Sequence, residues 1–292
     1  MQEKSSLAFA ALLIGAVGIA FAPIFVRLSE VGPSATAFYR LFLALPVLWL
    51  WRIQERTRPG APPCPASPGE YLQLALAGLL FAGDLALWHW SIKLTSVANA
   101  TLFANSAPIF VTLGARVLFR ERIRPSFIGA LALALAGAAM VVGVSLRLTL
   151  EHVFGDALAL AAAVFYGGYM LCLKHLRRSF STATILAWSG LASVAGLLLV
   201  AHISRESLQP ADWRGWFVLI ALALVSQVVG QGLIAYAFAH LPASFSSLSL
   251  LLQPAVAALL AWFILHESLR PLQIAGGCVI LAAIALAGRA GR

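Results

Sequence analysis

The feature that most constrains this chain is a series of ten apolar runs, separated by charged, proline or glycine residues. A helix needs about 20 apolar residues to cross the hydrocarbon core of a bilayer, and most of these runs approach that length. We therefore predict an all-α integral membrane protein with ten transmembrane helices. They cover residues 6–26, 35–51, 71–90, 97–115, 126–146, 157–173, 182–201, 216–239, 244–265 and 271–288.

The composition supports a membrane protein. Only 11% of the residues are charged and 61% are apolar, whereas an ordinary soluble domain carries roughly 25% charged residues. Ten spans leave only about 90 residues for loops and tails, so there is no room for a soluble enzyme domain. The three cysteines have no zinc-type spacing, and we expect no metal and no cofactor.

The distribution of basic residues predicts the orientation. The first run is longer than a signal-peptide core and Pro23 follows it, so we expect a span rather than a cleaved signal. An even number of spans places both termini on one side. That side carries about twice as many Lys and Arg residues as the other, which predicts cytoplasmic termini. The net charge of +9 therefore reflects topology, and we expect no nucleic-acid partner.

The chain contains an internal repeat at an offset of 146 residues. This offset pairs Pro108 with Pro254, Glu121 with Glu267 and Pro125 with Pro271. It divides the chain into two five-helix repeats, residues 1–146 and 147–292. Because five is odd, the second repeat enters the membrane from the opposite side, which makes an inverted repeat. Secondary transporters often have this architecture around a central cavity.

Short motifs then point to a family. Leu118-Phe119-Arg120-Glu121-Arg122, followed by Pro125, resembles the link between the fourth and fifth spans of the drug/metabolite transporter superfamily, and Leu265-His266-Glu267-Ser268-Leu269 repeats it. Residues 18–25 and 37–41 resemble that family's first two spans. The similarity is greatest to EamA-type ten-helix exporters, and among these to bacterial aromatic amino-acid exporters. It implies a cavity walled by spans 1–4 and 6–9, with spans 5 and 10 to one side, in the bacterial cytoplasmic (inner) membrane.

Two charged residues lie inside the predicted spans, Arg40 and Asp84, at similar depth. Charges in hydrocarbon are costly and normally face a partner or a wet cavity. A structural ion pair and a substrate or coupling site are both open interpretations. Asp84 and His89 are the obvious protonatable residues in the spans, so facilitated exchange and proton antiport both stay open.

Aromatic and polar side chains in the spans are candidates for the cavity wall, although the same residues can serve packing. They are Tyr39, Trp88, His89, Asn99, Phe103, Asn105, Tyr166, Tyr169, Trp188, Gln227, Gln231 and Tyr236. Pro108 and Pro254 are candidate hinges, because proline interrupts a helix. Glu121 and Glu267 are predicted to fix the turns into spans 5 and 10. The stripe of Ala130, Ala134 and Ala138 permits close packing within the protomer or in a dimer.

We therefore predict a secondary transporter that exports small metabolites from the cytoplasm by alternating access. An aromatic, weakly charged cavity favours uncharged aromatic or hydrophobic amino acids such as Phe, Trp, Tyr, Met and Thr. Export of other metabolites or drugs is the alternative, and a channel or scramblase is a different class. An enzyme is not expected, because no nucleophile–base pair is evident. The expected partners are an amino-acid substrate, the bilayer and the proton as a coupling ion, with a monomer or weak homodimer.

Overall fold

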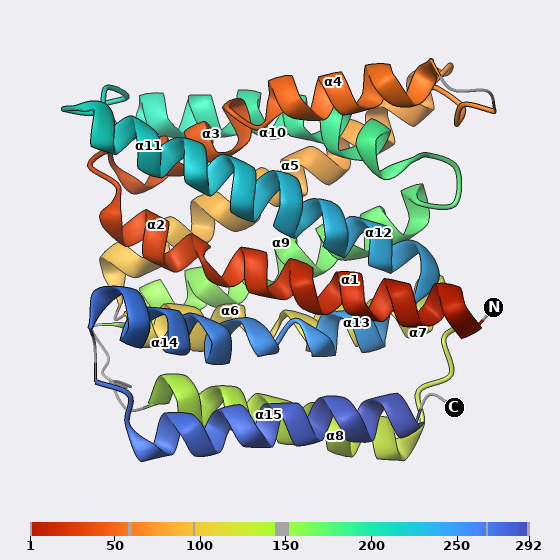
Figure 1. Ribbon diagram of the computed structural model, residues 1–292, viewed down its shortest axis with the longest axis vertical. Helices are drawn as coiled ribbons and strands as arrows, with labels where there is room; N and C mark the ends of the chain where they lie inside the picture. Colours follow the sequence, from red (N-terminus) through yellow and green to blue (C-terminus); the bar gives the residue numbers. More distant parts are fainter. Residues whose placement is uncertain (1, 58–59, 96, 144–151, 267, 291–292) are drawn as a thin grey trace.

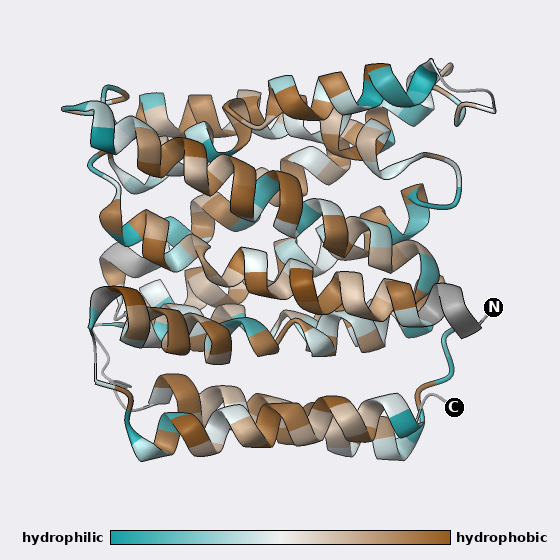
Figure 2. Ribbon diagram, viewed as in Figure 1, coloured by the Kyte–Doolittle hydropathy of each residue, from teal (hydrophilic) through white to brown (hydrophobic). Residues whose placement is uncertain are grey.

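The protein crosses the membrane region with helices alone. A computed structural model describes residues 2–57, 60–95, 97–143, 152–266 and 268–290. All the regular secondary structure in these residues is helical, and ten segments are long and apolar enough to span a bilayer. Figure 1 shows them packed side by side with both chain ends at the same edge. In Figure 2, brown apolar residues fill the middle of the helices and many of the teal hydrophilic ones gather towards their ends.

These ten segments, numbered here as spans 1 to 10 in chain order, confirm the predicted all-helical, ten-span fold. Boundaries agree within a few residues: the predicted 71–90 is observed as Pro68–Ser91, and the predicted 182–201 as Thr182–Ile203. The end of the predicted 126–146 span, residues 144–146, lies outside the described residues, as does Glu267.

Three spans of the first half are each broken into two helices, whereas span 3 and span 5 are continuous. In chain order the helices are α1 (Gln2–Ala20) and α2 (Ala22–Leu28), α3 (Pro33–Phe42) and α4 (Leu45–Arg56), α5 (Pro68–Leu94), α6 (Val97–Ala104) and α7 (Ala107–Leu118), and α8 (Pro125–Val142).

The second half has continuous helices in spans 6, 7 and 10, a π-helical segment inside span 8, and a break in span 9. Its elements are α9 (Val153–Leu176), α10 (Thr182–Ile203), α11 (Trp213–Ala221), the π-helix η3 (Leu222–Gln231), α12 (Gly232–His240), α13 (Ala243–Ser249), α14 (Leu252–Leu265) and α15 (Pro271–Ala290).

Proline accounts for the breaks. Pro23, Pro46 and Pro108 each lie in the first two residues of the helix that follows a break, and Pro254 is the third residue of α14. The first N–H groups of a helix have no acceptor within it, so proline is tolerated there, while its ring prevents continuation of the preceding helix. Spans 1, 2, 4 and 9 are therefore bent near their middles.

Spans 5 and 10 form a separate pair at one side of the bundle, as the family resemblance implies. Figure 1 shows α8 and α15 lying together along one edge. The stripe of Ala130, Ala134 and Ala138 is buried in one cluster with Ile280 and Ala283 of α15. A Cβ added at Gly137 would lie 2.9 Å from the carbonyl oxygen of Gly276, so the two backbones are in close contact. This alanine stripe therefore packs within the protomer.

Acidic residues of one half cap helices of the other half. The carboxylate of Glu121 accepts hydrogen bonds from the N–H of Ala243 (2.8 Å) and from the N–H and hydroxyl of Ser244 (3.3 and 2.7 Å), at the start of α13. Glu206 accepts from the N–H of Ala35 (2.9 Å) and the hydroxyl of Ser34 (3.1 Å), at the start of α3. The carboxylate of Glu121 thus holds span 9 of the other half, rather than the turn into span 5 as predicted.

Several features support the inverted repeat that we propose. Arg120 and His266, 146 residues apart, both adopt a left-handed backbone, with φ of 55° and 54°. Spans 4 and 9 are broken at equivalent positions, after Ala104 and after Ser249. Inter-span packing is also reciprocal: α5 of span 3 packs on α9 of span 6, and α1 of span 1 packs on η3 and α12 of span 8.

Candidate functional site

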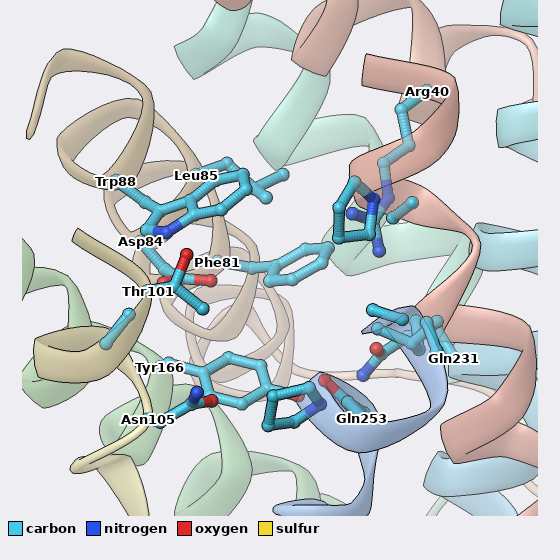
Figure 3. Close-up of a pocket in the computed structure, with 17 residues that line it drawn as sticks. Arg40, Phe81, Asp84, Leu85, Trp88, Thr101, Asn105, Tyr166, Gln231 and Gln253 are labelled. Atoms are coloured by element: carbon cyan, nitrogen blue, oxygen red, sulfur yellow. The ribbon is translucent and has the colours of Figure 1, made fainter. Parts of the chain in front are cut away.

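A small pocket lies among spans of both halves, on the side of the membrane region away from the chain ends. Its volume is about 170 Å³, and Figure 3 shows the side chains that line it. The lining residues come from α1, α2, α3, α5, α6, α9, η3 and α14, and include none from α8 or α15. Many lie beside the helix breaks, such as Ala22, Ala104 and Gln253.

The breaks also expose backbone polar groups to this region. A proline has no N–H, so the carbonyl four residues earlier loses its usual helical donor. For Pro23 and Pro108 these carbonyls belong to Ile19 and Ala104, and both residues line the pocket. The pocket therefore has potential backbone acceptors at the level of the helix breaks.

The pocket contains one positive and one negative side chain, Arg40 of α3 and Asp84 of α5. Figure 3 shows them on opposite sides of the Phe81 ring. The guanidinium carbon of Arg40 lies 5.8 Å from the centre of that ring, and its Nε donates to Oε1 of Gln227 at 3.1 Å. The two charges make no direct ion pair in the part of the chain described. They share a cavity without neutralising each other by contact.

The remaining wall is largely apolar and aromatic. One face of α5 supplies Phe81, Leu85 and Trp88 together with Asp84, because residues three, four and seven apart lie on one side of a helix. Ile19 and Pro23 of span 1 also line the pocket. This combination offers an apolar surface beside two separate charges.

Buried side chains close the pocket towards the chain ends. Tyr169, only 1% exposed, stacks on Phe81 with ring centres 4.6 Å apart. Its hydroxyl accepts a hydrogen bond of 3.0 Å from Nε2 of Gln231. Further towards the ends, Lys174 donates to the carbonyl of Leu241 at 2.6 Å, beside the Glu121 cap on α13. These groups lie between the pocket and the side of the chain ends.

A second, smaller cavity of about 30 Å³ continues beyond the pocket, between spans 4, 6 and 9. Asn105, Tyr166 and Gln253 line both cavities and so separate them. The amide nitrogens of Asn105 and Gln253 are buried with no acceptor among the described residues. Buried donors normally have partners, so these two amides are available to a polar ligand.

The structure brings about half of the predicted site residues into these cavities. Arg40, Asp84, Trp88, Asn105, Tyr166, Gln231 and Pro254 line the pocket, and Pro108 lines the smaller cavity. Gln227 and Tyr169 lie directly behind the wall, bonded to Arg40 and Gln231 respectively.

Five other candidates lie elsewhere in the bundle. The hydroxyl of Tyr39 donates to the carbonyl of Leu208, and Asn99 donates to Asp156. The ring of Tyr236 packs at a tilt against His240 near the chain-end side, and Phe103 is half-buried and does not line the pocket. His89 is buried against Trp88, with ring centres 5.1 Å apart.

Helix geometry explains these placements. Tyr39 and His89 are direct neighbours of Arg40 and Trp88, so they point about 100° away around the helix, and Phe103 faces away from Thr101 and Asn105 on α6. The last candidate, Trp188, lies in span 7, which contributes nothing to the pocket lining. Its ring packs on Trp49 and Tyr71.

Among the lining residues that were not predicted, the aromatic and polar ones are Phe81, Thr101 and Gln253. Phe81 is three residues before Asp84, and Gln253 directly precedes the break-forming Pro254. These short distances in sequence from Asp84 and Pro254 could have indicated that Phe81 and Gln253 also line the pocket.

The sequence profile of the EamA-like transporter family matches residues 6–143 and, again, residues 153–289. The chain belongs to the EamA-like transporter family. This confirms the resemblance seen in the sequence. Each match falls within one of the two proposed repeats.

Named relatives of this EamA protein include exporters. It is 27% identical to the pseudopaline exporter CntI of Pseudomonas aeruginosa over 72% of each chain. It is 29% identical to a probable terminal-alkyne amino-acid exporter of Streptantibioticus cattleyicolor, over 70% of this chain and 68% of the relative. A protein of known crystal structure matches the fold of this chain with a TM-score of 0.79 at 19% identity, covering 100% of this chain and 99% of that one.

The family and the fold establish a multi-pass membrane protein of a transporter family. Its relatives are named as transporters rather than enzymes. Among the described residues, no cluster of His, Cys, Asp and Glu could hold a metal ion.

Proposed function

We propose that this protein is a secondary transporter that exports uncharged amino acids with aromatic or hydrophobic side chains from the cytoplasm. The observation that carries the proposal is the pocket between spans of both halves, which combines Arg40, Asp84 and an aromatic wall. The exporters among its relatives support the direction of transport, and one of them is named for an amino acid.

The size of the pocket favours a small solute. Its volume of about 170 Å³ is close to the roughly 150 Å³ of an engineered cavity that holds benzene. Drug-sized ligands usually occupy pockets of about 300–1,000 Å³. A solute with several negative charges would need several inward-facing cations, and Arg40 is the one Lys or Arg in the pocket lining. An amino acid with a ring or an aliphatic side chain fits these limits.

Alternating access accounts for the arrangement of the two ends. The pocket lies away from the chain ends, and the Tyr169–Gln231 bond, Lys174 and Glu121 close the other side. With cytoplasmic termini in the inner membrane, this is the outward-facing state. The bends at Pro108 and Pro254 sit between the two sides and act as hinges, since a break lets the two helix pieces move separately.

Energy coupling has two forms in this proposal, facilitated exchange or proton antiport. Asp84 favours antiport, because this carboxyl lines the pocket and can exchange a proton there. His89 is buried and does not line the pocket. Transport by purified protein with and without an imposed pH gradient separates the two forms.

The test is counterflow in liposomes that contain only the purified protein. Vesicles preloaded with unlabelled amino acid are diluted into labelled Phe, Trp, Tyr, Met or Thr. We expect transient, saturable accumulation of at least one aromatic or hydrophobic amino acid, which a channel or scramblase cannot produce. No accumulation of any member of the panel would refute the amino-acid proposal and leave the fold unaffected.

A further inference from the structure

We propose that the pocket recognises its substrate as a zwitterion, with the α-carboxylate bound to Arg40 and the α-ammonium bound to Asp84, on opposite sides of Phe81. This rests on the proposed function and deepens it, because it names the chemical groups that a substrate must carry. It predicts that α-amino acids are accepted, and that the matching amines and carboxylic acids, which lack one of the two groups, are rejected.

Arg40 is held in one orientation and keeps its terminal nitrogens for the pocket. Its Nε is already bonded to Gln227, and its guanidinium lies over Phe81. Gln227 is itself only 3% exposed, so the hydrogen bond that supports Arg40 is buried within the bundle. Guanidinium binds a carboxylate through paired, parallel hydrogen bonds, and the planar group loses less freedom when it is already positioned.

Asp84 is the matching acceptor. Its carboxylate makes no hydrogen bond to any described residue, and it lines the same pocket from α5. A carboxylate in a weakly polar site needs a cation or several donors. Figure 3 shows the ring of Phe81 between it and Arg40, so the two residues do not satisfy each other directly. A ligand with an ammonium group and a carboxylate on one carbon would satisfy both.

The ring of Phe81 also explains why the two charges stay apart. It stacks on Tyr169 at 4.6 Å, and Tyr169 is in turn bonded to Gln231, so its position is fixed from the closed side of the pocket. The apolar residues Leu85, Trp88 and Pro23 line the rest of the wall and leave a surface for the substrate side chain. Specificity for the α-groups and tolerance of varied apolar side chains then follow together.

Asn105 and Gln253 provide a competing carboxylate site, because their buried amide nitrogens have no acceptor among the described residues. A carboxylate can accept hydrogen bonds from either site, but the guanidinium of Arg40 also carries the opposite charge and offers paired donors that match the two carboxylate oxygens. Arg40 is therefore the preferred partner for a carboxylate, and the two amides serve as a test of that assignment.

The experiment measures inhibition of phenylalanine counterflow in proteoliposomes by three compounds. These are phenylalanine, 3-phenylpropionate, which lacks the ammonium, and phenethylamine, which lacks the carboxylate. With wild-type protein we expect each analogue to inhibit about 10- to 100-fold more weakly than phenylalanine, the range for losing a hydrogen bond to a charged group. Equal inhibition by all three would overturn the inference while leaving transport intact. If another amino acid of the panel is transported and phenylalanine is not, the same comparison uses that amino acid with its matching carboxylic acid and amine. Absence of counterflow by every member of the panel would overturn the proposed function and the inference together.

Variants assign each group. In Asp84→Asn, 3-phenylpropionate should inhibit within about threefold of phenylalanine, and phenethylamine should remain a weak inhibitor. In Arg40→Gln, phenethylamine should inhibit within about threefold of phenylalanine, and 3-phenylpropionate should remain weak. Tyr39→Phe, at a residue outside the pocket lining, is the matched control and should preserve both ratios. The carboxylate assignment is wrong if phenethylamine inhibits nearly as strongly as phenylalanine in Asn105→Ala or Gln253→Ala and remains weak in Arg40→Gln. Asp84→Glu keeps the charge and should retain the ratios, whereas Arg40→Lys keeps the charge without the paired donors and should retain a reduced ratio for phenethylamine. They replace the neutral variants if those fail to fold in detergent, and loss of the ratios in these folded variants also refutes the assignment.

Discussion

Replacing Glu121 with alanine removes the carboxylate that caps α13 and should loosen the closed side of the transporter. The side chain accepts three hydrogen bonds, two from the N–H groups of Ala243 and Ser244 and one from the Ser244 hydroxyl. Helix α13 has only seven residues, so these bonds hold a large part of it. The change acts on one end of the molecule without touching the pocket lining.

The expected magnitude follows from the number and kind of these bonds. Hydrogen bonds to charged groups contribute about 1.5–3 kcal/mol each, and removing a helix cap costs about 1–2 kcal/mol. Glu121 is partly exposed, so we take a local loss of about 2 kcal/mol for the first turn of α13. Because each 1.4 kcal/mol corresponds to a factor of ten, amide exchange at Ala243 and Ser244 should accelerate about 30-fold. Glu121→Gln keeps an acceptor oxygen and should give a smaller acceleration.

The assay is hydrogen–deuterium exchange of the protein in nanodiscs, followed on peptides that cover residues 241–250. Glu206→Ala is the matched control, because Glu206 caps α3 at the opposite end through Ala35 and Ser34. It should accelerate exchange near Ala35 and leave α13 unchanged. Unaltered exchange at Ala243 and Ser244 in folded Glu121→Ala protein, or an equal effect of both variants on α13, would refute the reasoning.

Two further substitutions test the packing and the limits of the pocket. Gly78→Ala should lower the melting temperature in detergent and reduce expression, because its Cβ would lie 2.1 Å from the carbonyl oxygen of Ser189 and overpacking costs about 1–3 kcal/mol. Gly129→Ala, with nothing within 4 Å of the added carbon, should melt like the wild type, and equal melting of both variants would contradict this packing. Tyr39→Phe removes the 2.6 Å hydrogen bond to the carbonyl of Leu208 and should cost about 1 kcal/mol of stability. Its transport KM should not change, and a changed KM would place Tyr39 at the substrate after all.

Much of the fold was predictable because long apolar runs mark the spans and prolines mark the helix breaks, and both effects depend only on nearby sequence. The span observed at Pro68–Ser91 was expected at 71–90, and the breaks before Pro108 and Pro254 follow from the chemistry of proline. The π-helical segment Leu222–Gln231 was not expected. It contains no residue type that marks such a turn, and its register depends on packing against α1 and α3.

The site was less predictable, because a helix that is apolar all round does not reveal which face meets its neighbours. Arg40 and Asp84 were expected to lie close together only because of their similar depth in the membrane, and both line the pocket. Tyr39 and Trp188 were equally plausible by type, yet each packs in a different direction. The partner of Glu121 lies more than a hundred residues away in the chain, and no local pattern indicates such a contact.

The reciprocal caps have a consequence for how such a chain can originate. Glu121 holds a helix of the second half, and Glu206 holds a helix of the first, so the recognition between halves does not depend on their being one polypeptide. Two separate five-span proteins, inserted in opposite directions, could exchange the same bonds as an antiparallel dimer. Gene fusion would then have fixed a pairing that already existed. Residues 1–146 and 147–292, produced as independent chains in one cell, should therefore co-purify, and substitution of Glu121 should weaken their association.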